Sequence, residues 1–252
     1  PYRLPSLLGG LLAVLGLYLF GVPWFGRRCA FAAAVLLASS ILSGIQVRMA
    51  KADAPLLATA VFCLASLIHS YQGASQGSRR DGSATAAASR ETANPGRLRS
   101  GMLAAACFWI SLATAGLLKG PFLPCIAALT VSVLLVADRS LKLWHALRPR
   151  WGAPLLLIAT AAWFIPMELA GPVGYGKAGL MQDLLQKVLA GVESHFFPPG
   201  FYLASFWIFF FPGSLVAGVA VWQAWKARSH PALRVCLAWL LPLASFTLIV
   251  FF

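Results

Sequence analysis

Charged residues are scarce in this chain of 252 residues, and acidic ones are the scarcest: 7 Asp and Glu stand against 20 Lys and Arg. Only 11% of the residues are charged, whereas a soluble globular domain carries about a quarter. This scarcity excludes a soluble globular enzyme. A disordered chain is also excluded, because such chains are poor in apolar residues and 60% of this one is hydrophobic.

Cysteines are few and scattered, and no two of them form a Cys-x-x-Cys pair. A disulfide-rich secreted domain needs a dense cysteine framework, and a structural zinc site needs closely spaced thiolates, so both are excluded. We interpret the five cysteines as small, buried hydrophobic residues inside apolar runs. They are Cys29, Cys63, Cys107, Cys125 and Cys236.

The abundant feature is apolar sequence, with a mean hydropathy of +0.78. A formal net charge of +13 in a soluble protein would suggest nucleic acid as the partner, but the apolar content argues for a membrane instead. Backbone groups in a bilayer must be bonded within their own segment, so spanning runs of about 20 residues are helices. The prediction is therefore an all-α, polytopic transmembrane helical bundle. Eight spans are expected, at Pro5–Trp24, Cys29–Gln46, Ala54–Tyr71, Gly101–Leu118, Phe122–Ala137, Gly152–Met167, Phe201–Gln223 and Val235–Phe252.

The basic residues predict how the bundle lies in the membrane. The first, third, fifth and seventh connections hold 14 of the 20 Lys and Arg, and the other connections with Arg3 hold 6. Cytoplasmic loops carry the excess of basic residues, so the odd connections are predicted to face the cytoplasm. Two tight hairpins are expected, at Arg27-Arg28 and at Lys119-Gly120-Pro121.

Two connections differ in character. The segment 72–100 is rich in Ser, Ala, Gly and Arg and poor in large apolar residues, which predicts a disordered cytoplasmic linker. The external segment 168–200 contains an amphipathic pattern from Leu180 onward, with Asp183 and Lys187 forming an i,i+4 pair. That pattern fits a helix on the outer membrane surface equally as well as one packed on the bundle.

The chain begins at Pro1 without an initiator Met and ends in an apolar run. The first run lacks the basic start and small-residue cleavage site of a signal peptide. We therefore expect residues 1–252 to be an internal piece of one longer transmembrane domain.

A polar cluster is expected at the outer end of the third span, where Arg48, Lys51 and Asp53 lie close together in sequence. Asp53 directly precedes Ala54-Pro55, which is typical of a helix N-cap. The alternative is a carboxylate in a water-filled cavity near the membrane boundary. The two roles are compatible, since a capping Asp can also hold a neighbouring Lys or Arg.

Lys119 is a second candidate, because it lies between two long apolar runs. It can simply extend its ammonium to the interface. Ionisable groups near membrane depth are costly, however, and often mark a functional site. An ammonium there suits an anionic lipid headgroup, since Lys binds phosphate as a point charge.

Glu193 and His195 form a third polar pair, in the external segment. Two such residues without further ligands are more typical of a solvated loop than of a metal site, although His can bind metal or carry protons. His145 and His230 lie in basic connections, and His69 is interpreted as structural.

Several motifs occur in the order found in ArnT-like membrane glycosyltransferases, which the chain resembles over nearly all of its length outside 72–100. They are Tyr2–Gly10, Phe25–Arg28, Ala50–Ala54, Leu118–Pro121, Glu193–Tyr202 and Phe211–Ser214. These enzymes are bacterial relatives of the protein O-mannosyltransferases and have the GT-C fold.

The resemblance implies an enzyme of the bacterial inner membrane that moves a sugar from a polyprenyl phosphate carrier to an acceptor at the periplasmic face. In the family's namesake the acceptor is lipid A; a glycan or protein acceptor is also expected. Asp53 matches a family Asp, and Lys119 matches the Lys of a Thr-Lys-Gly-Pro motif, with Leu118 in place of Thr. The stretch with Glu193, His195 and Tyr202 matches the loop beside the donor site.

The resemblance also assigns chemistry to these positions. Lys119, with Arg48 or Lys51, is expected to bind the donor phosphate. The family's catalytic carboxylate is expected upstream of Pro1, and the family's Lys-Leu-Pro motif after the last span is missing, so residues 1–252 alone are predicted to be inactive. Whether a divalent metal takes part stays open.

A transporter or flippase for a lipid-linked or anionic substrate is the alternative. It would share polar clusters at the outer ends of spans, but it should contain repeated halves with broken helices at matching positions. We find no such repeat in the sequence. Residues upstream of Pro1 would decide between the two, because an Asp/Glu pair there favours the transferase.

Overall fold

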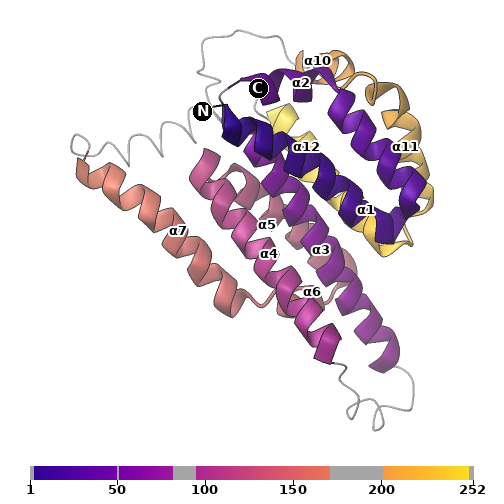
Figure 1. Cartoon of the computed structure of the whole chain (residues 1–252). Coiled ribbons are helices and arrows are strands. Elements are labelled where there is room, and N and C mark those ends of the chain that lie inside the picture. The colour runs from indigo at the N-terminus through magenta and orange to yellow at the C-terminus, as the bar shows by residue number, and fades with distance from the viewer. Residues whose placement is uncertain (1–2, 50, 82–94, 171–200, 250–252) are drawn as a thin grey trace.

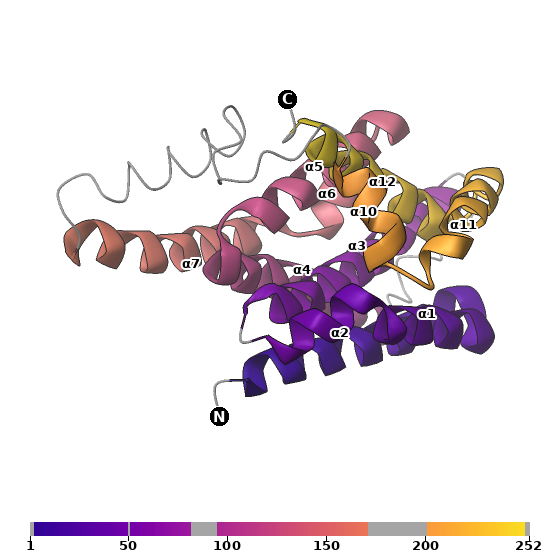
Figure 2. The same ribbon diagram turned by 90° about the horizontal axis from the view of Figure 1, so that it is seen from above.

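The structure is a computed structural model that describes residues 3–49, 51–81, 95–170 and 201–249, all within an antiparallel arrangement of helices (Figures 1 and 2). In chain order the helices are α1 (Leu4–Ser39), α2 (Ile41–Arg48), α3 (Asp53–Asp81), α4 (Pro95–Lys119), α5 (Phe122–Asp138), α6 (Lys142–Ala146), α7 (Pro149–Ala170), α10 (Phe201–Phe209), α11 (Ser214–Lys226) and α12 (Pro231–Ile249). This confirms the all-α class.

Helix α3 is the centre of the bundle, since α1, α4, α6 and α12 all pack against it. The seam of α1 that meets α3 consists of small buried residues three or four positions apart, including Ser6, Gly9, Ala13 and Gly16. A Cβ on Gly9 would overlap the backbone of Ala54 and Pro55. Small residues let helix backbones approach closely, so this seam brings the start of α1 against the start of α3.

Helix α1 is folded back on itself at Gly26, which has φ 80° and ψ 163°. A straight helix would separate Gly21 from Ala30 by about 13 Å, but a Cβ on Gly21 would lie 3.1 Å from the Cβ of Ala30. The chain therefore reverses at this point, with residues 4–25 running one way and 27–39 returning (Figure 1). The hairpin predicted at Arg27-Arg28 is confirmed, and Gly supplies the left-handed φ that the turn requires.

A tight hairpin also joins α4 to α5, as predicted, with only Gly120 and Pro121 between them. Gly120 has φ 71°, and its N–H donates to the carbonyl of Gly116 at 2.9 Å. This is the usual glycine end of a helix. It leaves Lys119 as the last residue of α4.

Helix α7 packs against the outer side of α4, and Trp109 of α4 lies at this contact. The Trp109 Nε1–H donates to the carbonyl of Leu147 at 2.7 Å, and a Cβ on Gly152 would overlap the Trp109 ring. On the other side of α3, residues of α5, α6 and α12 complete a continuous apolar core that includes Leu134, Leu143 and Val235.

The outer surface of the bundle is apolar. Large hydrophobic side chains stay exposed on α1, α7 and α11, for example Leu157 and Leu215, which are 69% and 68% exposed. Three helices are long and apolar enough to cross a membrane (Leu4–Ser39, Asp53–Ser75 and Arg99–Lys119), and two shorter apolar helices accompany them. The chain is a multi-pass membrane protein, while the count of eight spans stays a prediction.

Two predicted spans are wrong as single helices. The run Cys29–Gln46 is divided at Ser40, where α1 ends and the Ser40 hydroxyl oxygen accepts from the Ser43 N–H at the start of α2. The run Phe201–Gln223 is divided into α10 and α11, because Pro212 lacks the N–H that a continuous helix needs. The hydroxyl of Ser214 donates to the Trp207 carbonyl at 2.8 Å, and Gly213 lies against the ring of Phe210. The break between α10 and α11 is thus well packed, and the Trp207 carbonyl has a hydrogen-bond donor there.

The boundaries of the predicted linker are also corrected. Helix α3 continues to Asp81 and α4 begins at Pro95, so 72–81 and 95–100 are helical. Residues 82–94 lie outside the described residues, as do 171–200, where the amphipathic helix was predicted. The prediction that all five cysteines are buried is wrong for two of them, because Cys29 and Cys125 are exposed on the surface of the bundle.

The connections divide between the two ends of the bundle (Figure 1). One end, here called the basic end, carries the Gly26 turn, the connection between α5 and α7 and that between α11 and α12. There Lys226 lies over Trp222, and Arg228 lies over Trp225, with 4.9 and 5.0 Å between cation and ring centroid. Such aromatic and basic pairs are typical of a membrane interface. The opposite end, here called the Lys119 end, carries the end of α2, the start of α3 and the Gly120-Pro121 turn.

Candidate functional site

Lys119 and Asp53 form an ion pair at the Lys119 end, although 66 residues separate them in sequence. They meet because α3 and α4 pack side by side and antiparallel. Asp53 is the first residue of α3 and Lys119 the last of α4. Each charge therefore opposes the partial charge of its own helix end, and both helices place their ends at the same level.

The structure changes the role expected for Asp53. The N–H of Leu56 donates to the carbonyl of Ala52 at 3.0 Å, so Ala52 occupies the N-cap position and Asp53 is the first helical residue. The Asp53 carboxylate accepts from the Lys119 ammonium. Pro55 lies in the first turn, as predicted. The N-cap interpretation is therefore wrong, and the carboxylate pairs with Lys119, a partner that the sequence did not predict.

The pair is open to its surroundings. The Lys119 side chain is 56% exposed and that of Asp53 is 24% exposed. An ion pair this accessible stabilises a fold by at most about 1 kcal/mol, so it contributes little to holding the bundle together. An ammonium has three N–H donors, and Asp53 engages one of them. No other described residue accepts from the remaining donors, so within the described part of the chain they can bind an anion.

Arg48 and Lys51 lie beside this pair along the chain, and both are exposed. Arg48 is in the last turn of α2. The backbone at Lys51 is held by Ser6, whose hydroxyl donates to the Lys51 carbonyl at 2.9 Å. With Arg3 in the residue before α1, four basic residues and one acidic one among the described side chains belong to this end. Its local charge therefore favours an anion.

The other predicted site residues are not brought into this geometry. Glu193 and His195 lie outside the described residues, and only the backbone of Tyr202, in α10, is described. No group of three His, Cys, Asp or Glu side chains is placed to hold a metal ion in the part of the chain that the structure describes. Whether a metal takes part stays open, and the roles expected for Glu193, His195 and Tyr202 stay predictions.

A second ion pair, at the basic end, was missed. An Arg234 guanidinium N–H group lies 2.6 Å from the Asp138 carboxylate, and Tyr71 interacts with both. The three residues join α12, α5 and α3. An acidic residue at the end of an apolar run was the available signal, but nothing in the sequence identified its partner.

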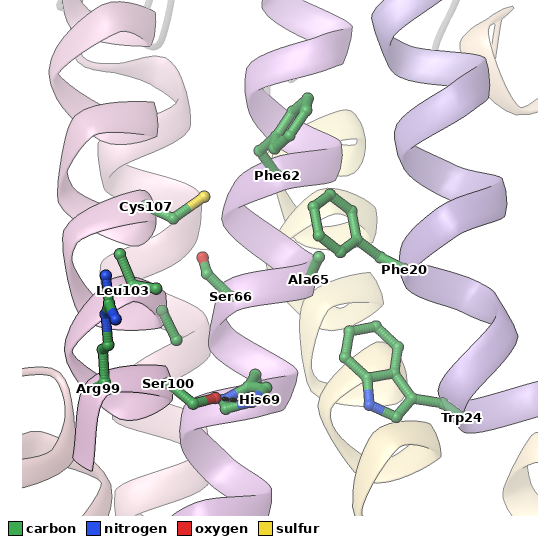
Figure 3. Close-up of a pocket in the computed structure, with 11 residues that line it drawn as sticks. Phe20, Trp24, Phe62, Ala65, Ser66, His69, Arg99, Ser100, Leu103 and Cys107 are labelled. Carbon is green, nitrogen blue, oxygen red and sulfur yellow. Dashed lines mark hydrogen bonds between the residues drawn. The ribbon is translucent and has the colours of Figure 1, made fainter. Parts of the chain in front are cut away.

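A cavity of about 410 Å³ lies at the basic end, between α1 and α4 and over α3 (Figure 3). His69, interpreted as structural, lines it, and its Nε2 lies 2.9 Å from the Ser100 hydroxyl. Along α3 the cavity begins at Phe62, about 13 Å from Asp53, and ends at His69, about 24 Å from Asp53. It was not predicted from the sequence.

Comparison with known proteins places the fold. No protein-family model matches the chain, and no curated protein matches it. Among solved structures, ArnT from Cupriavidus metallidurans matches in its apo state with a TM-score of 0.71 and 19% identity, covering 98% of this chain. The same protein bound to undecaprenyl phosphate matches with a TM-score of 0.76, over 99% of this chain.

The chain shares the ArnT fold. This confirms, for the fold, the resemblance that the motifs suggested, and an identity of 19% supports the fold alone. The chain spans 40 to 41% of the length of the ArnT chains it matches. Activity and substrates are therefore argued separately below.

Proposed function

We propose that the protein is a membrane glycosyltransferase that takes a sugar from a polyprenyl phosphate carrier and passes it to an acceptor. The carrier phosphate binds at the Lys119 end, and the reaction takes place at the periplasmic face of a bacterial inner membrane. The acceptor is a lipid of the lipid A kind, a glycan or a protein. The ArnT fold supports this kind of activity, and one matching ArnT structure is bound to undecaprenyl phosphate.

The observation that carries the proposal is the exposed Lys119–Asp53 pair at the junction of α3 and α4. A polyprenyl phosphate needs an apolar surface for its chain and a cation at the membrane boundary for its phosphate. Lys119 supplies the cation, held in place by Asp53, and among the described residues its other N–H donors have no acceptor. Arg48 and Lys51 add positive charge, and the exposed Leu117 of α4 continues an apolar surface toward the bilayer.

In the proposed reaction, the acceptor hydroxyl oxygen forms a bond to the anomeric carbon of the sugar as the bond from that carbon to the phosphate oxygen breaks. A carboxylate removes the acceptor proton, and the carrier phosphate departs with the bonding electrons. Lys119 stabilises the charge that develops on the phosphate. The carboxylate is expected upstream of Pro1, so residues 1–252 are proposed to be inactive alone.

Lys119→Ala in the full-length protein tests the proposal. Transfer from a labelled polyprenyl-phosphate sugar to membrane lipids or protein should fall to background, while insertion and thermal stability persist. Lys226→Ala, at the basic end, is the matched control and should keep full activity. Unchanged transfer by the Lys119 variant would refute the phosphate role. Carrier movement between leaflets without release of the sugar would favour the transporter alternative.

A further inference from the structure

The cavity at the basic end combines an apolar groove with a polar mouth. α1 and α4 both pack on α3 and leave a space between them. Phe20 from α1, Phe62 from α3 and Leu103 from α4 line that space (Figure 3). Phe62 and His69 are seven residues apart on α3, so the groove follows the helix axes for about 10 Å.

The groove is accessible from the bilayer. Leu103 is 64% exposed, although it lies one turn inside Arg99–Lys119, the segment of α4 that is long and apolar enough to cross the membrane. A volume of about 410 Å³ is within the range of small-molecule sites. The molecules that reach an apolar groove on a membrane-facing surface are lipids, and an acyl chain fits its walls.

The mouth of the groove selects the headgroup. Arg99 lies there with Ser100 and His69, which are joined by the hydrogen bond already described. Arg99 is exposed and has no acidic partner among the side chains that the structure describes. Trp24, from the α1 hairpin, closes the other side (Figure 3). A guanidinium over an apolar groove is complementary to a phosphate diester with an acyl chain.

We propose that this groove binds one anionic glycerophospholipid of the cytoplasmic leaflet, with its phosphate on Arg99 and the Ser100–His69 pair and an acyl chain between α1 and α4. The basic end is the end predicted to face the cytoplasm, where anionic lipids accumulate. The headgroup end of the site is about 24 Å along α3 from Asp53, and the site shares no residue with the Lys119 end, so the inference does not rest on the proposed transferase activity.

The test uses full-length protein in nanodiscs that contain phosphatidylglycerol with a photoactivatable acyl chain. Cross-links mapped by mass spectrometry should fall on peptides covering 62–69 and 99–107. Arg99→Gln should lower the yield about fivefold, because one basic residue near the surface contributes about 1 kcal/mol to the binding of anionic lipid. Leu103→Trp should lower the yield by filling the groove.

Two matched variants control for general effects. Arg150→Gln removes an exposed charge at the same end, and Ile110→Trp enlarges an exposed residue two turns along the same helix. Both should keep the wild-type yield. Three outcomes would overturn the proposal: cross-links in wild-type protein that avoid both peptides, equal labelling by phosphatidylcholine, or displacement of the label by excess undecaprenyl phosphate.

Discussion

The Asp53–Lys119 pair leads to a prediction about binding of the carrier. In the proposal, the carrier phosphate competes with Asp53 for the Lys119 ammonium. Asp53→Asn removes the competing charge and nearly preserves the shape of the side chain. The variant should therefore bind undecaprenyl phosphate more tightly than wild type.

The magnitude follows from the exposure of the pair. A pair this accessible is worth up to about 1 kcal/mol, and releasing it tightens binding by up to about fivefold. Repulsion between Asp53 and the phosphate also disappears. At roughly 7 Å in water and 0.15 M salt, that repulsion is worth only about 0.3 kcal/mol, or less than about twofold. Most of the gain therefore requires Lys119.

A double-mutant cycle separates the two effects. Lys119→Ala alone should weaken binding by about 10- to 150-fold, since a hydrogen bond to a charged group contributes about 1.5–3 kcal/mol. Adding Asp53→Asn to Lys119→Ala should then change affinity by less than about twofold. The measurement is equilibrium binding of radiolabelled undecaprenyl phosphate to full-length protein in detergent.

Asp138→Asn is the matched control, because its carboxylate is paired with Arg234 and is 23% exposed, against 24% for Asp53. It should leave carrier binding unchanged. An equal gain from Asp53→Asn with and without Lys119 would refute competition for the ammonium. Weaker binding by Asp53→Asn would show instead that the carboxylate positions Lys119 for the phosphate.

Two further predictions concern packing and orientation. Gly152→Ala places a methyl group against the Trp109 ring and disturbs the hydrogen bond from that ring to the Leu147 carbonyl. It should therefore destabilise the protein by about 2–5 kcal/mol, measured as a lower melting temperature in detergent. Gly116→Ala, with open space around it, is the control and should not lower the melting temperature. In a cysteine-free background, a membrane-impermeant maleimide applied to intact cells should label Met49→Cys but not Leu141→Cys, both of which replace exposed side chains at opposite ends. The reverse pattern would invert the topology.

Hydropathy predicted the bundle better than it predicted helix boundaries. Hydropathy reports how well a segment partitions into lipid, so it identified the apolar part of α3. It assigned the polar residues 72–81 to a linker, because it cannot show that a helix continues beyond the membrane into water. The same average concealed the break at Pro212, because Phe and Trp around it keep the run apolar. Pro212 and Gly213 were visible in the sequence, and they were the signal for two helices.

The candidate site was predictable in part. Lys119 and Asp53 were each identified as ionisable residues at the ends of apolar runs, and consecutive antiparallel helices bring such ends together. The pair of Asp138 with Arg234 was out of reach, because α5 and α12 are distant in sequence and their contact is set by packing on α3. The groove could not be predicted either, since it is formed by the packing of α1 and α4 side by side on α3.

The Lys119–Asp53 and Arg234–Asp138 ion pairs have equally exposed carboxylates, but the surroundings of their cations differ. Arg234 interacts with Tyr71 as well as Asp138, and Tyr71 is only 6% exposed, so this cluster ties α3, α5 and α12 together. Lys119 is bonded to Asp53 at an exposed helix end, next to a surplus of Arg3, Arg48 and Lys51. A cation that served only to join helices would gain nothing from that exposure or from further positive charge nearby, whereas a phosphate site requires both. This contrast is the physical reason for assigning the carrier phosphate to the Lys119 end.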